Sequence, residues 1–255
     1  MKVASFNING IKARLPNLIN WLNTSNPEIV ALQEIKSVDQ NFPRDEIEEL
    51  GYNIVTHGQK GFNGVAILSK YPIEDISFGL PGDKNDNQSR WLEATIESYR
   101  ICCLYLPNGN PVDTEKYHYK INFMDRLFKR AKDFIIYEQK SIILGDFNVI
   151  PYEIDAKNIS EWSNDALYRQ EIRLKFFKIL NIGYTDSIRS QNPFSEIFTF
   201  WDYQKRSWER NNGIRIDHIL LCPESSDSLI SCGIDSHIRE TDKPSDHVPV
   251  WVEVN

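Results

Sequence analysis

Short apolar runs alternate with a few amphipathic stretches along the whole chain, and this alternation constrains the fold more than any other feature. Runs rich in β-branched and aromatic residues predict strands at residues 2–8, 28–34, 52–57, 64–70, 90–98, 100–107, 141–148, 197–203, 215–222, 228–238 and 248–254. Apolar residues at helical spacing predict helices at residues 15–25, 114–138 and 166–181. No Pro/Gly/Ser-rich linker separates these segments. We therefore expect an α/β fold in which residues 1–255 form one domain with two strand-rich halves, each flanked by helices.

The charge balance is acidic, with 36 acidic and 29 basic residues and a formal net charge of −7. This balance argues against a strongly basic nucleic-acid-binding protein. Setting aside the four carboxylates of Glu34, Asp146, Asp217 and Asp246 changes the charge from −7 to −3, and a bound divalent ion brings it to −1. A local basic face then becomes feasible, and its candidate contributors are Lys12, Arg14, Lys36, Lys60, Arg90, Lys205, Arg206, Arg210 and Arg215.

The four cysteines fit a reducing compartment. Cys102 and Cys103 are neighbours in a predicted strand, so their side chains should point to opposite faces. Cys222 and Cys232 lack the spacing of a metal site, and we expect four reduced thiols. The first residues, MKVASFNING, contain no apolar signal core, and no segment approaches the roughly 18 apolar residues of a membrane span. We therefore expect a cytoplasmic protein without membrane contact.

Polar residues gather at the ends of the predicted strands. In GDFNVIP, residues 145–151, Asp146 and Asn148 follow a buried run and should project to the same side. Other strand ends contribute Asn7, Glu34, Tyr105, Asn108, Asp246 and His247. Each of these residues alone is typical of a turn or a solvated strand end. Together they suggest a shared polar site.

Asp217 is the hardest of these residues to explain as ordinary surface polarity, because isoleucines and leucines surround it. A buried aspartate needs a charged or hydrogen-bonding partner. His247 is the obvious candidate, since a carboxylate can orient an imidazole and favour its charged form. The alternative is that Asp217 pairs with Arg215 or a backbone amide, and that His247 is only a turn residue.

Several carboxylates and amides with one His–Asp pair are typical of a site for a hard cation. Mg²⁺ prefers oxygen ligands, which Glu34 and Asp246 would supply. The five histidines show no zinc-type spacing. Such a site suits phosphodiester hydrolysis, in which the ion stabilises charge on the phosphoryl oxygens and Asp146 prepares the water. Neutral donors would come from Asn148, Tyr105 and His247.

The ordered motifs resemble those of the exonuclease III family of apurinic/apyrimidinic endonucleases. They are Asn7, LQEIK (32–36), GVAIL (64–68), YLPNG (105–109), GDFNVIP (145–151), FTFWDY (198–203), NNGIRIDHIL (211–220) and SDHVPVW (245–251). The resemblance implies a four-layer αββα sandwich of two mixed sheets covered by helices, as in the endonuclease/exonuclease/phosphatase superfamily. It implies a monomeric DNA repair enzyme that acts on double-stranded DNA with abasic sites or blocked 3′ ends.

The same resemblance implies particular reactions and residue roles. Such enzymes cut 5′ to an abasic site and leave a 3′-hydroxyl, and many add 3′→5′ exonuclease and 3′-phosphatase or phosphodiesterase activity, with Mg²⁺ and with Mn²⁺ as a substitute. Glu34 resembles the principal metal ligand, with Asp246 and Asn7 nearby. Asp146 resembles the base, Asn148 the transition-state stabiliser and Tyr105 the catalytic tyrosine. His247 resembles the phosphate-contacting histidine, oriented by Asp217. Family structures differ over one or two ions, which makes Asp146, Asn148 and His247 candidate ligands of a second ion.

The resemblance also implies where DNA binds. Phe200, Trp201, Ile214 and Ile216 match positions that line a small apolar pocket, which can admit a sugar without a base. Many relatives have Trp where this chain has Ile214, so the tightness of the pocket stays open. We also expect Lys36, Asn108 and Arg215 to contact DNA.

Rival functions share the scattered motifs of the superfamily. A secreted deoxyribonuclease would need a signal peptide and a disulfide, a sphingomyelinase would need apolar membrane-facing loops, and neither pattern is seen. An inositol-polyphosphate phosphatase would need a basic pocket for a multiply charged ring. A catalytically inactive, DNA-binding member is disfavoured because every expected polar position is filled. The leading alternative is a metal-dependent phosphatase or phosphodiesterase for a different substrate.

Overall fold

Two six-stranded β-sheets form the centre of the computed structural model, which describes all 255 residues. The first sheet contains, in spatial order, β11 (Leu229–Ile234), β12 (Val250–Val254), β1 (Lys2–Asn7), β2 (Ile29–Gln33), β4 (Val65–Ser69) and β3 (Asn53–His57). The second contains β5 (Glu74–Phe78), β6 (Trp91–Ile96), β7 (Tyr99–Tyr105), β8 (Ser141–Asp146), β10 (Asp217–Leu221) and β9 (Thr185–Asp186). Both sheets are mixed, with the parallel pairs β1–β2 and β7–β8 among antiparallel neighbours.

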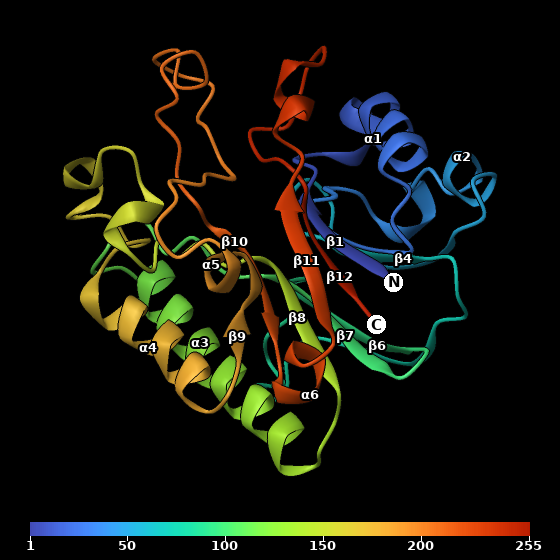
Figure 1. Cartoon of the computed structure of the whole chain (residues 1–255), viewed down its shortest axis with the longest axis horizontal. Coiled ribbons are helices and arrows are strands. Elements are labelled where there is room, and N and C mark those ends of the chain that lie inside the picture. Colours follow the sequence, from blue (N-terminus) through green and yellow to red (C-terminus); the bar gives the residue numbers. More distant parts are fainter.

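Helices surround the two sheets. They are α1 (Ile11–Ser25), α2 (Asp45–Glu48), α3 (Glu115–Ile136), α4 (Gln170–Asn181), α5 (Ser187–Gln191) and α6 (Pro223–Ser226), with 3₁₀ turns η1 (Asp39–Asn41), η2 (Glu153–Asp155), η3 (Ile159–Trp162) and η4 (Ser236–Glu240). The long helices α3 and α4 lie side by side on one outer side, and α1 and α2 lie on the other (Figure 1). Each parallel strand pair is therefore joined by a crossover helix, α1 or α3.

Three apolar layers hold the sandwich together. The inter-sheet layer contains residues of both sheets, such as the fully buried Val3 and Ile142. A second layer packs α1 on the first sheet, and a third packs α3 and α4 on the second sheet. Cys103 lies in the inter-sheet layer and Cys102 in the α3–α4 layer, and all four cysteines are free, as predicted. The four-layer αββα sandwich is thus confirmed.

The segment 197–203, which was predicted as a strand, is irregular in the structure. The backbone amides of Thr199 and Phe200 donate to the carbonyl oxygen of Ile214 at 2.8 and 3.0 Å, whereas that of Trp201 donates to Asp246 O at 2.9 Å. The strand prediction is wrong because these bonds go to two different loops. The apolar pattern was nevertheless informative, since Phe198 and Trp201 are buried.

Other differences concern element boundaries. Helix α1 begins at Ile11 rather than at residue 15, and α4 begins at Gln170 rather than at residue 166. Strand β11 ends at Ile234, where η4 soon follows, instead of continuing to residue 238. Strand β5 was not predicted, because its sequence EDISF is polar and the strand lies at a sheet edge. None of the helices combines the length and the apolar character needed to cross a lipid bilayer.

Candidate active site

The polar strand ends identified in the sequence meet at one end of the sandwich. In the second sheet, Asp146 at the end of β8 is paired with Tyr105 at the end of β7 and with Asp217 at the start of β10. In the first sheet, Asn7 ends β1 and Glu34 directly follows β2. Nδ2 of Asn7 lies 2.9 Å from Oδ2 of Asp146, so a side-chain hydrogen bond joins the ends of the two sheets. In α/β proteins, ligands bind beyond the carboxyl ends of the strands.

The backbone at this end is unusual in three places. A Cβ on Gly145 would lie 1.8 Å from the carbonyl oxygen of Leu104, so only glycine allows β7 and β8 to approach directly before Asp146. Glu34 and Asn148 have φ angles of 50° and 47°, in the left-handed region that few side chains adopt. Such conformations cost about 1–3 kcal/mol each and cluster at functional sites.

Glu34 lies between two hydrogen-bond donors. Its Oε1 accepts from Nδ2 of Asn7 at 3.0 Å, and its Oε2 lies 2.8 Å from Nζ of Lys36. Burial acts to raise the pKa of Glu34, but the hydrogen bonds from Lys36 and Asn7 outweigh burial and lower this pKa. Glu34 therefore presents a stable negative charge at neutral pH.

Asp146 is almost fully enclosed, with 1% of its surface exposed. Its Oδ1 accepts from the backbone amide of Asn148 at 2.9 Å, and its Oδ2 accepts from Asn7. Burial raises the pKa of Asp146, and the negative charges of Asp217 and Glu34 add to this effect, which neighbouring His247 only partly offsets. A carboxyl with a pKa raised toward neutrality is suited to taking up and releasing a proton.

His247 is held by a carboxylate, as the sequence predicted. Its Nδ1 lies 2.8 Å from Oδ2 of Asp217, and its Nε2 lies 3.7 Å from Oδ2 of Asp146. Thr199 donates through Oγ1 to the same Asp217 oxygen at 2.6 Å. Burial acts to lower the pKa of His247, but the two aspartates outweigh it and raise this pKa. The predicted Asp217–His247 pair is confirmed, and its imidazolium carries a second N–H that faces Asp146.

Arg215 has a different environment from the one predicted. Its guanidinium is fully buried, with Nε donating to Asp155 Oδ1 at 2.7 Å and Nη1 donating to Asp186 Oδ2 at 2.8 Å. Nη1 also lies 3.0 Å from Nδ1 of His218. The alternative pairing of Asp217 with Arg215 is therefore wrong. The expected DNA contact of Arg215 is corrected as well, because no part of its side chain reaches the surface.

Asn148 is fixed from several sides. Its Nδ2 donates to the carbonyl oxygen of Leu106 at 2.9 Å, and its Oδ1 accepts from Nδ2 of Asn108 at 3.3 Å. The fully buried Lys120 of α3 donates through Nζ to the backbone oxygens of Asn148 and Asn108, at 2.6 and 2.9 Å. One ammonium group thus holds together the two loops that follow β7 and β8.

Tyr105 contributes a neutral hydroxyl. Burial raises the pKa of Tyr105, and the negative charges of Glu34 and Asp146 raise it further, so the phenol stays protonated. The guanidinium of Arg90 lies 4.6 Å from the centre of its ring. Tyr105 can therefore act as a hydrogen-bond donor toward a phosphate.

A cavity of about 260 Å³ lies among these side chains. The predicted site residues on its wall are Glu34, Tyr105, Asn108, Asp146, Asn148, Phe200, Ile216, Asp246 and His247. Three residues, Glu34, Asp146 and His247, each offer one possible ligand atom for a metal ion, and these three atoms lie within 4.8 Å of one another. The Oδ1 of Asp246 accepts from Asn9 at 2.9 Å. This donor set, rich in carboxylate oxygens, fits a hard divalent cation. The buried Asn7 does not line the cavity, and its Nδ2 faces Glu34 and Asp146.

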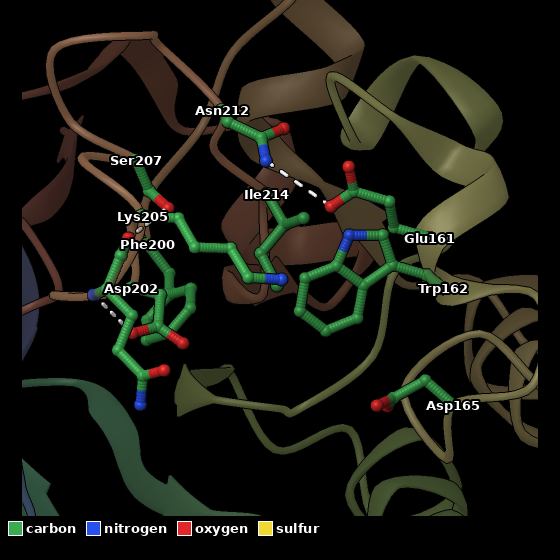
Figure 2. Close-up of a pocket in the computed structure, with 10 residues that line it drawn as sticks. Glu161, Trp162, Asp165, Phe200, Asp202, Lys205, Ser207, Asn212 and Ile214 are labelled. Carbon is green, nitrogen blue, oxygen red and sulfur yellow. Dashed lines mark hydrogen bonds between the residues drawn. The ribbon is translucent and has the colours of Figure 1, made fainter.

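The predicted pocket is larger and more polar than expected. A second cavity of about 540 Å³ adjoins the first, and only three of its ten lining residues are hydrophobic, among them Phe200 and Ile214 (Figure 2). Trp201 lines neither cavity, because it is 3% exposed and packs edge-on against Trp208. Phe200, Ile214 and Ile216 line the two cavities as expected, whereas the expectation that Trp201 lines the pocket is wrong.

The sequence analysis did not identify five residues on the wall of the catalytic cavity, Asn110, Trp162, Asp165, Leu167 and Asp202. It also missed three residues that hydrogen-bond to the site, and two of these three had left a signal. Thr199 is a lone polar residue between Phe198 and Phe200. Lys120 lies three residues after Tyr117 and four before Met124, on the apolar face of the predicted helix. Asn9 left no signal. It accepts from Nζ of Lys36 at 2.5 Å and donates to Asp246.

Comparisons with known proteins agree with this geometry. Residues 4–247 match the model of the Endonuclease/Exonuclease/phosphatase family. The chain is 32% identical to exodeoxyribonuclease III of Haemophilus influenzae, and the match covers 99% of each chain. Among solved structures, an AP endonuclease from Archaeoglobus fulgidus is 35% identical with a TM-score of 0.95, covering 100% of this chain and 99% of that one. The 3′ phosphatase NExo from Neisseria, bound to a product DNA hairpin, is 34% identical with a TM-score of 0.97, covering 100% and 99%. The chain therefore belongs to the endonuclease/exonuclease/phosphatase family, in the exonuclease III branch of apurinic/apyrimidinic endonucleases that its motifs indicated.

Proposed function

We propose that this protein is a Mg²⁺-dependent DNA repair nuclease that hydrolyses the phosphodiester 5′ to abasic sites in double-stranded DNA. We include 3′→5′ exonuclease activity and removal of 3′-phosphate and related 3′ blocks. The observation that carries the proposal is the cavity at the strand ends, where Glu34, Asp146 and the Asp217–His247 pair converge. The names of the relatives, an exodeoxyribonuclease III, an AP endonuclease and a 3′ phosphatase, support the same class of reaction.

Glu34 and Asp246 would hold the metal ion, and Mn²⁺ would serve as a substitute for Mg²⁺. When bound, the ion supplies charge stabilisation on the phosphoryl oxygens. The orientation of Asn7, with its amide nitrogen toward Glu34 and Asp146, favours a positioning role over direct ligation. In the two-ion alternative, a second ion would use Asp146, Asn148 and a His247 that has lost its Nε2 proton.

The side chains around the cavity divide the remaining chemistry. Asp146 accepts the proton of the attacking water, since its buried carboxyl has a raised pKa. Water attacks phosphorus, the bond from phosphorus to the 3′ oxygen breaks, and that oxygen takes a proton to become the 3′-hydroxyl. The N–H of His247, the amide of Asn148 and the hydroxyl of Tyr105 stabilise the extra negative charge on the phosphate oxygens.

DNA would approach from the open side of the two cavities. Asn108 is exposed at the rim, and Phe200, Ile214 and Ile216 form the apolar part of the walls. Lys36 is partly exposed beside Glu34, where it can contact a phosphate. We propose that the protein acts as a monomer in the cytoplasm.

An incision assay tests the proposal. The substrates are a duplex with one tetrahydrofuran site, an intact duplex, a nicked duplex and a duplex with a 3′-phosphate end, each with Mg²⁺, Mn²⁺ or EDTA. We expect cleavage 5′ to the tetrahydrofuran and loss of the 3′-phosphate with either metal, and neither reaction in EDTA. Asp146→Asn serves as the matched inactive control. Hydrolysis of a small phosphomonoester but of no DNA substrate would contradict the proposal.

A further inference from the structure

The second cavity is placed to receive part of the substrate. Its volume of about 540 Å³ adds to the 260 Å³ of the catalytic cavity, and Trp162, Asp165, Phe200 and Asp202 line both. A group bonded to a phosphate in the catalytic cavity can therefore extend directly into the second one. The nucleotide on the 3′ side of the cleaved bond is the natural candidate for this position.

The size of the second cavity exceeds what a sugar without a base requires. Cavities of roughly 300–1,000 Å³ hold drug-sized ligands. A deoxyribose ring is only a small part of such a ligand, whereas a complete nucleoside is comparable in size. The second cavity thus has room for a nucleotide that keeps its base.

The charges around the second cavity indicate which part of a nucleotide enters it. Glu161, Asp165 and Asp202 contribute three carboxylates, against the single cation of Lys205. This excess of negative charge disfavours a phosphate. Carboxylates accept hydrogen bonds from amino groups such as those on cytosine and adenine. The occupant is therefore an uncharged group with N–H donors, which describes a base.

Trp162 supplies a flat aromatic wall. It ends η3 and packs, partly buried, against the apolar cluster that contains Ile214. Trp162 and Phe200 lie on opposite sides of the cavity, and the side chain of Lys205 extends between them (Figure 2). Indole faces stack well on bases of any sequence.

We propose that Trp162 is a specificity-determining residue that stacks on the base of a 3′-terminal nucleotide, so that the enzyme removes base-bearing 3′ nucleotides. The proposal rests on the proposed nuclease function. Water attacks the phosphorus between the last two nucleotides, and the bond to the 3′ oxygen of the penultimate one breaks. The products are a nucleoside 5′-monophosphate and a new 3′-hydroxyl, which receives the proton released from the water.

Two variants separate stacking from packing. Trp162→Leu keeps an apolar side chain but loses the aromatic face, and Trp162→Phe keeps a smaller face. Phe194→Leu is the matched control, because Phe194 is an aromatic residue that is 89% exposed and lines neither cavity. Thermal unfolding of each variant verifies that it folds.

Single-turnover rates are measured on a recessed 3′ end with a normal terminal nucleotide and on the same duplex with a 3′-phosphate. We expect Trp162→Leu to slow nucleotide removal by about 5- to 150-fold, the range for loss of one base–aromatic stack. Trp162→Phe should be intermediate, and removal of the 3′-phosphate should be unchanged. Equal losses on both substrates, or no loss on either, would overturn the proposal.

A binding measurement in EDTA keeps this test independent of catalysis. A duplex with 2-aminopurine as its 3′-terminal base should be quenched by the parent and by Phe194→Leu, and much less by Trp162→Leu. If the parent cleaves no DNA but quenching depends on Trp162, the proposed function fails and the stacking role stands. If the parent cleaves DNA but quenching is the same in all variants, the stacking role fails alone.

Discussion

Asp217→Asn tests whether a buried carboxylate keeps His247 charged. The asparagine oxygen can still accept from His247 Nδ1 and Thr199 Oγ1, which lie 2.8 and 2.6 Å from Oδ2 of Asp217. The new amide nitrogen would replace Oδ1, a buried atom without a hydrogen-bond partner. The variant thus loses a charge and gains an unpaired donor, which by itself costs about 1–3 kcal/mol. Breaking a buried ion pair costs about 3–5 kcal/mol in all.

The pH dependence of this loss has a definite sign. Asp217 and Asp146 raise the pKa of His247 above its unfolded value of 6.5 despite its burial. The ion pair therefore stabilises the fold fully below pH 6.5, and its contribution disappears as the pH rises through the folded pKa. The difference in unfolding free energy between parent and variant should be about 3–5 kcal/mol below pH 6.5. It should shrink toward the unpaired-donor cost of about 1–3 kcal/mol at alkaline pH.

Urea denaturation across the pH range measures this difference, and NMR follows the titration of His247 directly. The alkaline limb of the kcat/KM profile for abasic-site incision should also move to lower pH in Asp217→Asn. Thr199→Val is the control, because it removes a hydroxyl from the same Asp217 oxygen but keeps the charge. It should lower stability with a much smaller change in the His247 titration. An unchanged pKa of His247 in Asp217→Asn would refute the assigned role of Asp217.

Three further substitutions test other parts of the site. Asp146→Asn should lower the incision rate by about 10²- to 10⁴-fold while the protein stays folded, because burial already disfavours the charged carboxylate; an active, folded variant would exclude Asp146 as the base. Glu34→Gln should raise the Mg²⁺ concentration for half-maximal rate, with partial rescue at high Mg²⁺, and an unchanged Mg²⁺ titration would place the ion elsewhere. Burial lowers the pKa of Lys120 to about 7 from 10.5, so the unfolded chain binds more protons at this residue between these values, and the contribution of Lys120 to the stability of the parent should rise with pH there. In urea denaturation, Lys120→Met should lack this contribution, and it should slow incision because Asn108 and Asn148 are held less firmly. If the unfolding free energies of parent and variant depend on pH in parallel, this expectation is contradicted.

Much of the site could be predicted from the sequence because its residues lie at strand ends. Buried strands are visible as apolar runs, and the residue after such a run has a predictable place at the sheet edge. Asp146, Asn7 and Glu34 were found in this way, and the structure brings them into direct contact. The strand register explains why, since Tyr105 and Asp217 are the direct neighbours of Asp146 in the second sheet.

The shape of the second cavity could not be predicted from the sequence, because irregular segments form its walls. Trp162 lies in a 3₁₀ turn and Lys205 in an irregular loop with a φ of 55°. Neither segment has a periodic pattern that would place its side chains relative to β10. Ile214, by contrast, lines this cavity as the resemblance to the family had implied.

Arg215 shows why a buried charge predicts a partner without identifying it. Arg215 precedes Asp217 by two residues, so in a continuous strand both side chains would point to the same face. However, β10 begins only at Asp217, so Arg215 lies outside the strand. Before that point the chain runs beside the segment around Asp155, whose carbonyl oxygen accepts from the Arg215 amide at 2.8 Å. This path turns the guanidinium inward to Asp155 and Asp186, which are contributed by segments far apart in the sequence. Asp217 has its partner at the same end of the sandwich, where His247 precedes β12. Its apolar neighbours had indicated a buried aspartate that needs a partner, with His247 as the leading candidate, but only the structure excluded Arg215.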